Sequence, residues 1–141
     1  MYRHDYILRL IQHLGAALIT LRDRILRRER DEIGVREEVG EIARQAGLDL
    51  EVARSLHPQQ LLMWLAPVGE PDPAKLWLMA ELLYLEGLHA HGTGAPGWRA
   101  DLERALAILT HLSGDWRPDR PFASAGERLA EIRALLDSAP A

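Results

Sequence analysis

Residues 7–25, ILRLIQHLGAALITLRDRI, decide the fold of this 141-residue chain. Their apolar side chains recur at steps of three and four residues, the spacing that lines one face of an α-helix. The positions concerned are Ile7, Leu10, Ile11, Leu14, Ala17, Leu18, Leu21 and Ile25. Because Arg9 and Arg22 lie on the other side of the segment, the apolar stripe has to be covered by another part of the molecule. We therefore predict a long amphipathic helix over residues 3–30.

The composition favours helices throughout the chain. Leu occurs 25 times and Ala 19 times, whereas Val occurs 4 times and Thr 3 times, so good helix formers far outnumber β-branched strand formers. A chain of this length suits one domain and can bury roughly two thirds of its unfolded surface. The absence of cysteine excludes disulfides, thiolate metal ligands and cysteine nucleophiles. We predict a single all-α domain over residues 1–141.

Helix starts and stops are marked by a few residues. Within residues 33–66 we expect short helices, because Gly47 can adopt the positive φ that ends a helix and Asp49 can cap the next one. Near the carboxyl end, Ser124 is followed three residues later by a Glu, which is the spacing of a capping box. A final helix is therefore predicted over residues 124–137.

A helical hairpin is predicted over residues 73–112. Its first segment, residues 73–90, is apolar on nearly every side, and a helix of this kind is usually buried among others. We expect it at the centre of the fold, with the amino-terminal helix packed along the hairpin. Residues 91–97 contain three Gly and one Pro and are expected to form an exposed loop, and residues 98–112 supply the second helix. The chain is then a compact bundle of six or seven helices.

The charge distribution gives little support for nucleic-acid or membrane binding. The net charge is −4 at pH 7, yet residues 1–30 carry seven Arg against three acidic residues. This basic patch is short and the rest of the chain is acidic, so we expect no nucleic-acid partner. No uncharged stretch approaches the roughly 20 apolar residues that span a bilayer, and the amino terminus lacks the pattern of a signal peptide. We expect a cytoplasmic protein without membrane association.

Motifs for catalysis or metal binding are incomplete. The serines lie in no Gly-x-Ser-x-Gly frame, and the glycines of residues 92–97 follow a helix rather than the strand that a phosphate loop requires. Glu86 and His89 have the i, i+3 spacing of di-metal bundles, but those need the element twice and one copy exists. His89, His91 and His111 could gather around zinc, although no carboxylate partner for them is evident. We predict no enzymatic activity, no metal and no cofactor.

The four Trp residues are divided between apolar segments and loop edges. Trp64 and Trp77 occur on apolar segments, and we expect both in the core. Trp98 and Trp116 flank the predicted loops. Amphipathic aromatic side chains commonly close the edge of a core, which is the interpretation we favour, and they also anchor interfaces.

Residues 5–11, Asp-Tyr-Ile-Leu-Arg-Leu-Ile, resemble the start of an uncharacterised bacterial family of helical proteins, a domain of unknown function. Members of that family begin with a similar Asp-Tyr-Ile-x-Arg pattern. The resemblance implies a helical, cytoplasmic protein and supplies no activity.

Residues 77–118 are similar to a single tetratricopeptide repeat. The matching positions are Trp77, Ala80 and Tyr84 in the first helix and Ala105, Leu109 and Leu112 in the second, with Pro118 near the closing proline. Glu81 stands where the repeat prefers Gly, and the connection between the two helices is longer than the repeat allows. One copy is visible, so the resemblance implies a repeat-like hairpin with an enlarged loop rather than an array.

Three hypotheses about function remain. The leading one is a non-catalytic interaction or scaffold protein that presents a helical groove to a segment of another protein, with Trp116 as a possible contact. The alternative is a small-molecule or metal-binding bundle whose pocket is lined by four side chains, namely Tyr84, His89, Trp98 and His111. A homodimer formed through the stripe of the first helix is compatible with either.

Overall fold

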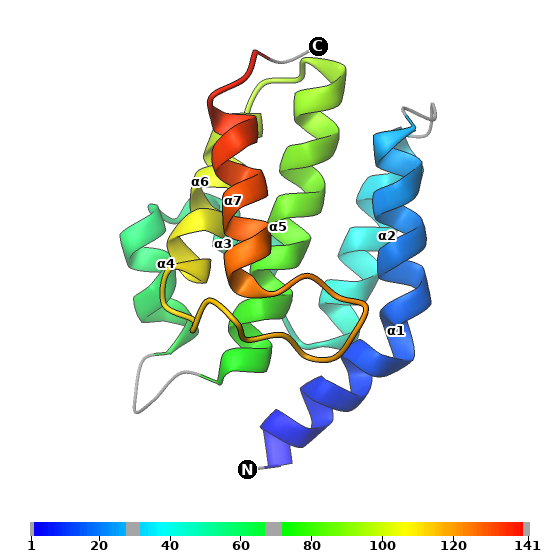
Figure 1. Ribbon diagram of the computed structural model, residues 1–141, viewed down its shortest axis with the longest axis vertical. Coiled ribbons are helices and arrows are strands. Elements are labelled where there is room, and N and C mark those ends of the chain that lie inside the picture. Colours follow the sequence, from blue (N-terminus) through cyan, green and yellow to red (C-terminus); the bar gives the residue numbers. More distant parts are fainter. Residues whose placement is uncertain (1, 28–31, 67–71, 140–141) are drawn as a thin grey trace.

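This computed structural model describes residues 2–27, 32–66 and 72–139. These residues contain seven α-helices and no strand (Figure 1). The helices are α1 (Tyr2–Leu26), α2 (Glu32–Gln45), α3 (Leu50–Ser55), α4 (Pro58–Leu65), α5 (Pro73–Thr93), α6 (Trp98–Leu109) and α7 (Ala125–Leu136). The predicted compact all-α bundle of six or seven helices is confirmed. The helix predicted over residues 3–30 ends at Leu26, and residues 28–30 lie outside the described residues.

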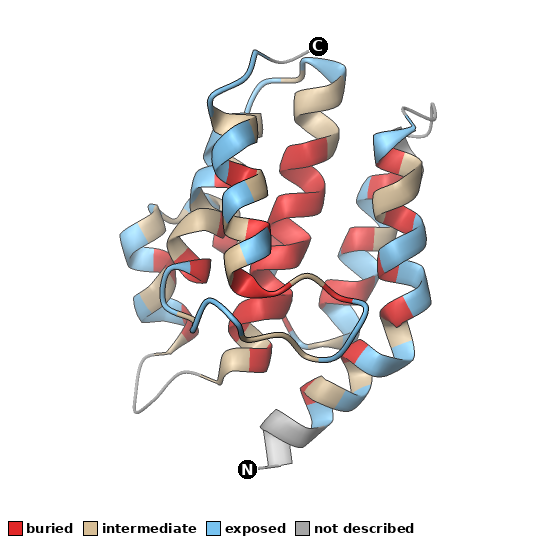
Figure 2. Ribbon diagram, viewed as in Figure 1, coloured by how far each residue is buried: buried red, intermediate tan, exposed pale blue. Residues whose placement is uncertain are grey.

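Helix α5 lies at the centre of the bundle and packs against α1, α2, α6 and α7 (Figure 1). Every residue from Leu76 to Leu88 is buried, so the buried residues of Figure 2 are concentrated on this helix. The helix begins where the Asp72 carboxylate accepts a hydrogen bond from the Ala74 N–H at 3.0 Å, with Pro73 in the first turn. Its apolar sequence on all sides explains its position, because each face meets another helix.

Helices α5 and α6 form the predicted hairpin, but its loop is shorter than the sequence indicated. The helix continues through His91 and Gly92, and it ends where Gly94 takes the left-handed conformation at φ 70°. The expectation that residues 91–93 belong to the loop is therefore wrong, because the left-handed residue that ends the helix is Gly94. The second helix ends at Leu109 rather than at residue 112.

The two hairpin helices approach closely at Gly87. A Cβ atom built on Gly87 would lie 2.7 Å from Cδ2 of Leu102, a distance that real Cβ atoms essentially never show. Leu102 itself is fully buried in the core. The missing side chain at Gly87 therefore sets how near α6 lies to α5.

The apolar stripe of α1 is buried inside the molecule, where α1 packs against α5. The fully or nearly fully buried members are Ile7, Ile11, Leu18, Leu21 and Ile25. Leu10 and Leu14 are half-buried and Ala17 is exposed, so the packed stripe is narrower than predicted. No helix of the described residues is long and apolar enough to cross a membrane.

The two Trp residues expected in the core have different surroundings. Trp77 is buried, donates a hydrogen bond from Nε1 to the Ala123 carbonyl at 3.2 Å, and meets the Phe122 ring edge to face. Trp64 is 38% exposed, so the prediction of a core position is wrong. The short helix α4 buries Leu61 and Leu65, and Trp64 lies outside that buried pair.

The helix ends predicted from the sequence are present. Gly47 has φ 70° after α2, and the Asp49 side chain accepts a hydrogen bond from the Val52 N–H at 3.1 Å at the start of α3. At the start of α7, Ser124 and Glu127 form the reciprocal capping box. These local signals fix the lengths of α2, α3 and α7.

Candidate functional site

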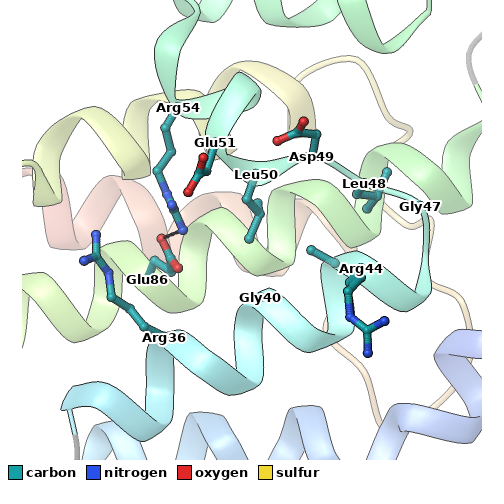
Figure 3. A pocket seen from close by; sticks show the side chains of 11 residues that line it. Arg36, Gly40, Arg44, Gly47, Leu48, Asp49, Leu50, Glu51, Arg54 and Glu86 are labelled. Carbon is teal, nitrogen blue, oxygen red and sulfur yellow. Dashed lines mark hydrogen bonds and ion pairs between the residues drawn. The ribbon is translucent and has the colours of Figure 1, made fainter.

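An open groove of about 620 Å³ lies between α2, α3 and α5 (Figure 3). We call it the α2–α3–α5 groove, and the residues on which its description depends are Arg36, Gly40, Gly47, Leu50, Arg54 and Glu86. Helix α2 ends at Gly47, and α3 starts only after Asp49, so the two helices form two sides of the groove. The buried helix α5 supplies Glu86 to its floor.

Two glycines leave this groove open. Gly47 has a structural reason to be glycine, because its positive φ ends α2. Gly40 lies inside α2, and nothing lies within 4 Å of the place where its Cβ would be. Glycine inside a helix costs about 0.5–1 kcal/mol relative to alanine. No packing contact in the described residues compensates this cost at Gly40, and its absent side chain exposes the α2 backbone to the groove.

Replacement of Gly40 by Ala should raise the free energy of unfolding by about 0.5–1 kcal/mol, because it improves helix propensity without a steric clash. Urea unfolding monitored by circular dichroism measures this change. Gly47→Ala serves as the control with opposite sign, since alanine is strained at φ 70°. A Gly40→Ala protein that is less stable than the wild type would show that Gly40 has a packing role.

An ion pair between a partly exposed Arg and a buried Glu crosses the floor of the groove. Arg54 of α3 donates from Nη2 to Oε2 of Glu86 on α5, and the two side chains point toward each other in Figure 3. The Glu86 side chain is 7% exposed and that of Arg54 is 27% exposed. Burial raises the pKa of Glu86, although the Arg54 charge opposes this shift and nearby Asp101 adds to it. The pair therefore ties α3 to α5 in a place largely removed from water.

The same pair has unused hydrogen-bonding capacity. Nε of Arg54 and Oε1 of Glu86 are both buried, and neither has a hydrogen-bond partner among the described residues. Most buried polar groups in proteins are hydrogen-bonded, and exceptions often mark places that hold water, an ion or a ligand. One donor and one acceptor of this ion pair are thus left unpaired beneath the floor of the groove.

A smaller cavity of about 310 Å³ adjoins the groove, because Arg36 and Glu86 line both. It lies between α2, the end of α5 and the start of α6, and His89 and Asp101 are among its lining residues. Asp101 forms an ion pair with Arg104 at 3.6 Å, and burial raises its pKa. Charged groups of three helices therefore meet around Glu86.

The stability of the protein should decrease as the pH rises above the ordinary carboxyl pKa, on account of Glu86 and Asp101. Because their pKa values are raised in the folded state, their contribution to stability is fully present below the ordinary carboxyl pKa and is lost as the pH rises through the raised values. Asp101→Asn should flatten this pH dependence in urea unfolding experiments. Glu103→Gln, a change at an exposed carboxylate of the same helix, should leave it unaltered. Equal pH profiles for the wild type and Asp101→Asn would contradict the assignment.

A second buried network lies on another side of α5. Arg128 of α7 forms a bidentate pair with Glu81 of α5 at 2.6 and 3.0 Å, and it also contacts Glu131 at 2.8 Å. The Tyr84 hydroxyl donates to Glu131 and accepts a hydrogen bond from Nε of Arg22 at 2.9 Å. This network borders a cavity of about 470 Å³. Since its polar atoms are bonded to one another, we interpret it as a structural link between α1, α5 and α7.

The five residues singled out from the sequence lie in different surroundings. Tyr84 is buried in the second network, and Trp98 is half-buried with its ring 4.8 Å from that of His91. His111 is exposed after α6, and Trp116 is half-buried in the following loop. His89 is the one of the five that lines a cavity described above. The structure therefore does not gather them around a common pocket.

Sequence reasoning named Glu86 for its spacing to His89, but it missed the ion pairs of the two buried Glu residues and the role of Gly40. Glu81 and Glu86 stand out in the sequence because they interrupt an otherwise apolar helix, and a buried carboxylate needs a partner. Their partners Arg128 and Arg54 come from other helices. Gly40 could also have been noticed in the sequence, because a glycine in the interior of a helix lowers its stability.

Neither a search for metal sites nor comparison with known proteins points to a function. In the described residues, no group of three or more His, Cys, Asp or Glu side chains is arranged to hold a metal ion. In comparisons with known proteins, no family model, no curated protein and no solved structure matches this chain.

Proposed function

We propose that this protein is a non-catalytic binding protein whose α2–α3–α5 groove accepts an extended segment of a partner protein. The observation that carries the proposal is Gly40: an interior helix glycine with no steric requirement, placed where a side chain would enter the groove. Gly40 lowers the stability of α2. A binding site in which the partner has to reach the α2 backbone would explain why a glycine stands there.

The chemistry of the groove floor supports a polypeptide as occupant. Nε of Arg54 and Oε1 of Glu86 are buried and unpaired among the described residues, so a small rotation of these side chains toward the groove would let them bond to a peptide carbonyl and a peptide N–H. In an extended segment the N–H and C=O of one residue point to the same side, so one residue of the partner offers a donor and an acceptor that match this pair. The open shape of the groove suits an extended chain that enters and leaves it.

The lining of the groove favours binding over catalysis. It contains no Ser, Thr or His, and Cys is absent from the chain. Its buried carboxylate, Glu86, is held by Arg54, while the carboxylate of Asp49 caps α3. None of these groups forms the nucleophile and base pair that covalent catalysis requires.

Peptide display tests the proposal. Random peptides selected on the immobilised wild-type protein are added to the ¹⁵N-labelled protein, and the shifts of its backbone amide signals are followed. We expect the largest shifts at Gly40, Gly47 and Leu50, with little change along α7. Selected peptides that shift α7 instead, or a library that yields no binder, would refute the proposal.

The alternative of a small-molecule-binding bundle is favoured by one observation, the cavity of about 310 Å³ beside His89.

Homodimerisation through α1 stays a prediction. Since the stripe is buried, it would have to use the exposed apolar side chains Tyr6, Ile19 and Leu26. Cytoplasmic residence, the likeness of α5 and α6 to a tetratricopeptide hairpin, and the likeness to an uncharacterised bacterial family stay predictions as well.

A further inference from the structure

One cation of the α2–α3–α5 groove has no counter-charge of its own. Arg36 lines both the groove and the adjoining cavity, and it is exposed. In the part of the chain that the structure describes, its guanidinium forms no ion pair and no hydrogen bond. The other two Arg residues of the groove are engaged, since Arg54 is bound to Glu86 and Arg44 donates hydrogen bonds to Glu41 at 2.6, 2.7 and 3.0 Å. Arg36 is therefore available to a ligand.

The charges around Glu86 sum to an excess of one positive charge. Arg54 neutralises Glu86, and Arg104 forms an ion pair with Asp101 at 3.6 Å. Arg36 is the third cation near these two carboxylates. Burial raises the pKa of both carboxyl groups, and the charge of Arg36 is among those that oppose the rise. An excess of positive charge favours a ligand that brings an anion to this end of the groove.

Arg36 is placed to meet a chain that crosses Gly40. The two residues are four positions apart in α2, so they lie on the same face of the helix, one turn from each other. Figure 3 shows Arg36 at the end of the groove where the Arg54–Glu86 pair lies, with Arg44 toward the other end. One turn is about 5.4 Å long, so a side chain of a segment that contacts the backbone at Gly40 is within reach of the long Arg36 side chain.

The opposite wall of the groove carries an exposed anion, Glu51 of α3. Glu51 lies in the first turn of α3, where a negative charge is favourable for the helix itself. Arg36 has no such role in α2, because it lies in the first half of that helix and a cation is favourable in the last turn. The charge of Arg36, rather than that of Glu51, therefore indicates which ligand the groove selects.

We infer that the partner segment carries an Asp or Glu side chain whose carboxylate pairs with Arg36. The inference rests on the proposed function and specifies the chemistry of the partner. A planar guanidinium matches a carboxylate through two parallel hydrogen bonds. A phosphorylated side chain calls for a cluster of Arg residues, and Arg44 and Arg54 are already bound. A side chain is expected rather than a terminal carboxylate, because the open groove lets the segment continue past Arg36.

Two parallel selections from one random peptide library test the inference, one on the wild-type protein and one on Arg36→Gln. Arg36 is exposed and its guanidinium is unpaired among the described residues, so this variant should fold like the wild type. We expect Asp or Glu to be enriched at one position of the peptides selected on the wild type. The enrichment should be absent from the peptides selected on Arg36→Gln.

Titration calorimetry with one selected peptide, synthesised with an amidated carboxyl terminus, measures the contribution of the pair. Arg36→Gln should weaken binding about threefold to tenfold, as expected for a charge pair at the rim of an interface. Arg133→Gln, which removes the same charge from an exposed position of α7, should bind like the wild type. A peptide with its Asp or Glu replaced by Lys should bind weakly to the wild type and more tightly to Arg36→Glu.

The outcomes separate this inference from the proposed function. Peptides that shift the amide signal of Gly40 but bind equally to the wild type and to Arg36→Gln would overturn the inference and leave the groove as the binding site. Enrichment of Lys or Arg, or binding only of peptides with a free terminal carboxylate, would overturn it as well. A library without any binder refutes the proposed function, and the inference with it.

Discussion

Replacement of Arg128 by Met is expected to lower the free energy of unfolding by about 3–5 kcal/mol, the largest effect that the structure predicts. The side chains of Arg128 and Glu81 are 7% and 6% exposed, and Glu81 has its two hydrogen bonds to Arg128. Without Arg128 the Glu81 carboxylate would remain buried in the centre of the bundle with no cation beside it. Urea unfolding monitored by circular dichroism measures the loss.

Two further variants separate the ion pair from general damage to α7. The double variant Glu81→Leu with Arg128→Met should recover most of the loss, because a buried ion pair replaced by apolar side chains is often neutral. Arg133→Met, at an exposed Arg of the same helix, should change stability by less than about 0.5 kcal/mol. If the double variant is as unstable as Arg128→Met alone, the unpaired charge of Glu81 is not the cause of the lost stability.

The second large effect is expected at the contact of α5 with α6. Gly87→Ala should lower stability by about 1–3 kcal/mol, because the added Cβ would lie within 3 Å of two side-chain atoms of Leu102. Leu102→Ala alone should cost about 2–5 kcal/mol through the cavity that it leaves.

The double variant is the informative member of this series. Gly87→Ala combined with Leu102→Ala should cost less than the sum of the single changes, because the new methyl group fills part of the space that Leu102 vacates. Gly92→Ala, on the same helix with open space around its Cβ position, should not destabilise the protein through a steric clash. Strictly additive losses would contradict close packing of Gly87 against Leu102.

The sequence predicts the helices well because their signals are local. The run of apolar residues in α5 indicates a buried helix, and Asp49 and Ser124 mark helix starts through bonds that span three residues. The end of α5 was harder to place, since Gly92 and Gly94 are both able to end a helix and only the folded chain shows that Gly94 does.

The candidate site is less accessible to sequence reasoning because its residues meet through tertiary packing. Arg54 lies 32 positions from Glu86, and Arg128 lies 47 positions from Glu81. Periodicity shows that the two Glu residues lie on a buried helix, but the identity of their partners depends on how α3 and α7 pack against α5. His89 was recognised as a candidate, whereas its neighbour Asp101 belongs to the next helix and was not.

The affinity of a selected peptide for three forms of the protein tests the central claim, that the α2–α3–α5 groove is the binding site. The forms are the wild type, Gly40→Leu, which places a side chain in the groove, and Gly92→Leu, which adds the same side chain to a helix outside it. We predict that Gly40→Leu weakens binding at least tenfold, equivalent to about 1.4 kcal/mol, while Gly92→Leu binds like the wild type. Equal affinities of Gly40→Leu and the wild type would contradict the claim.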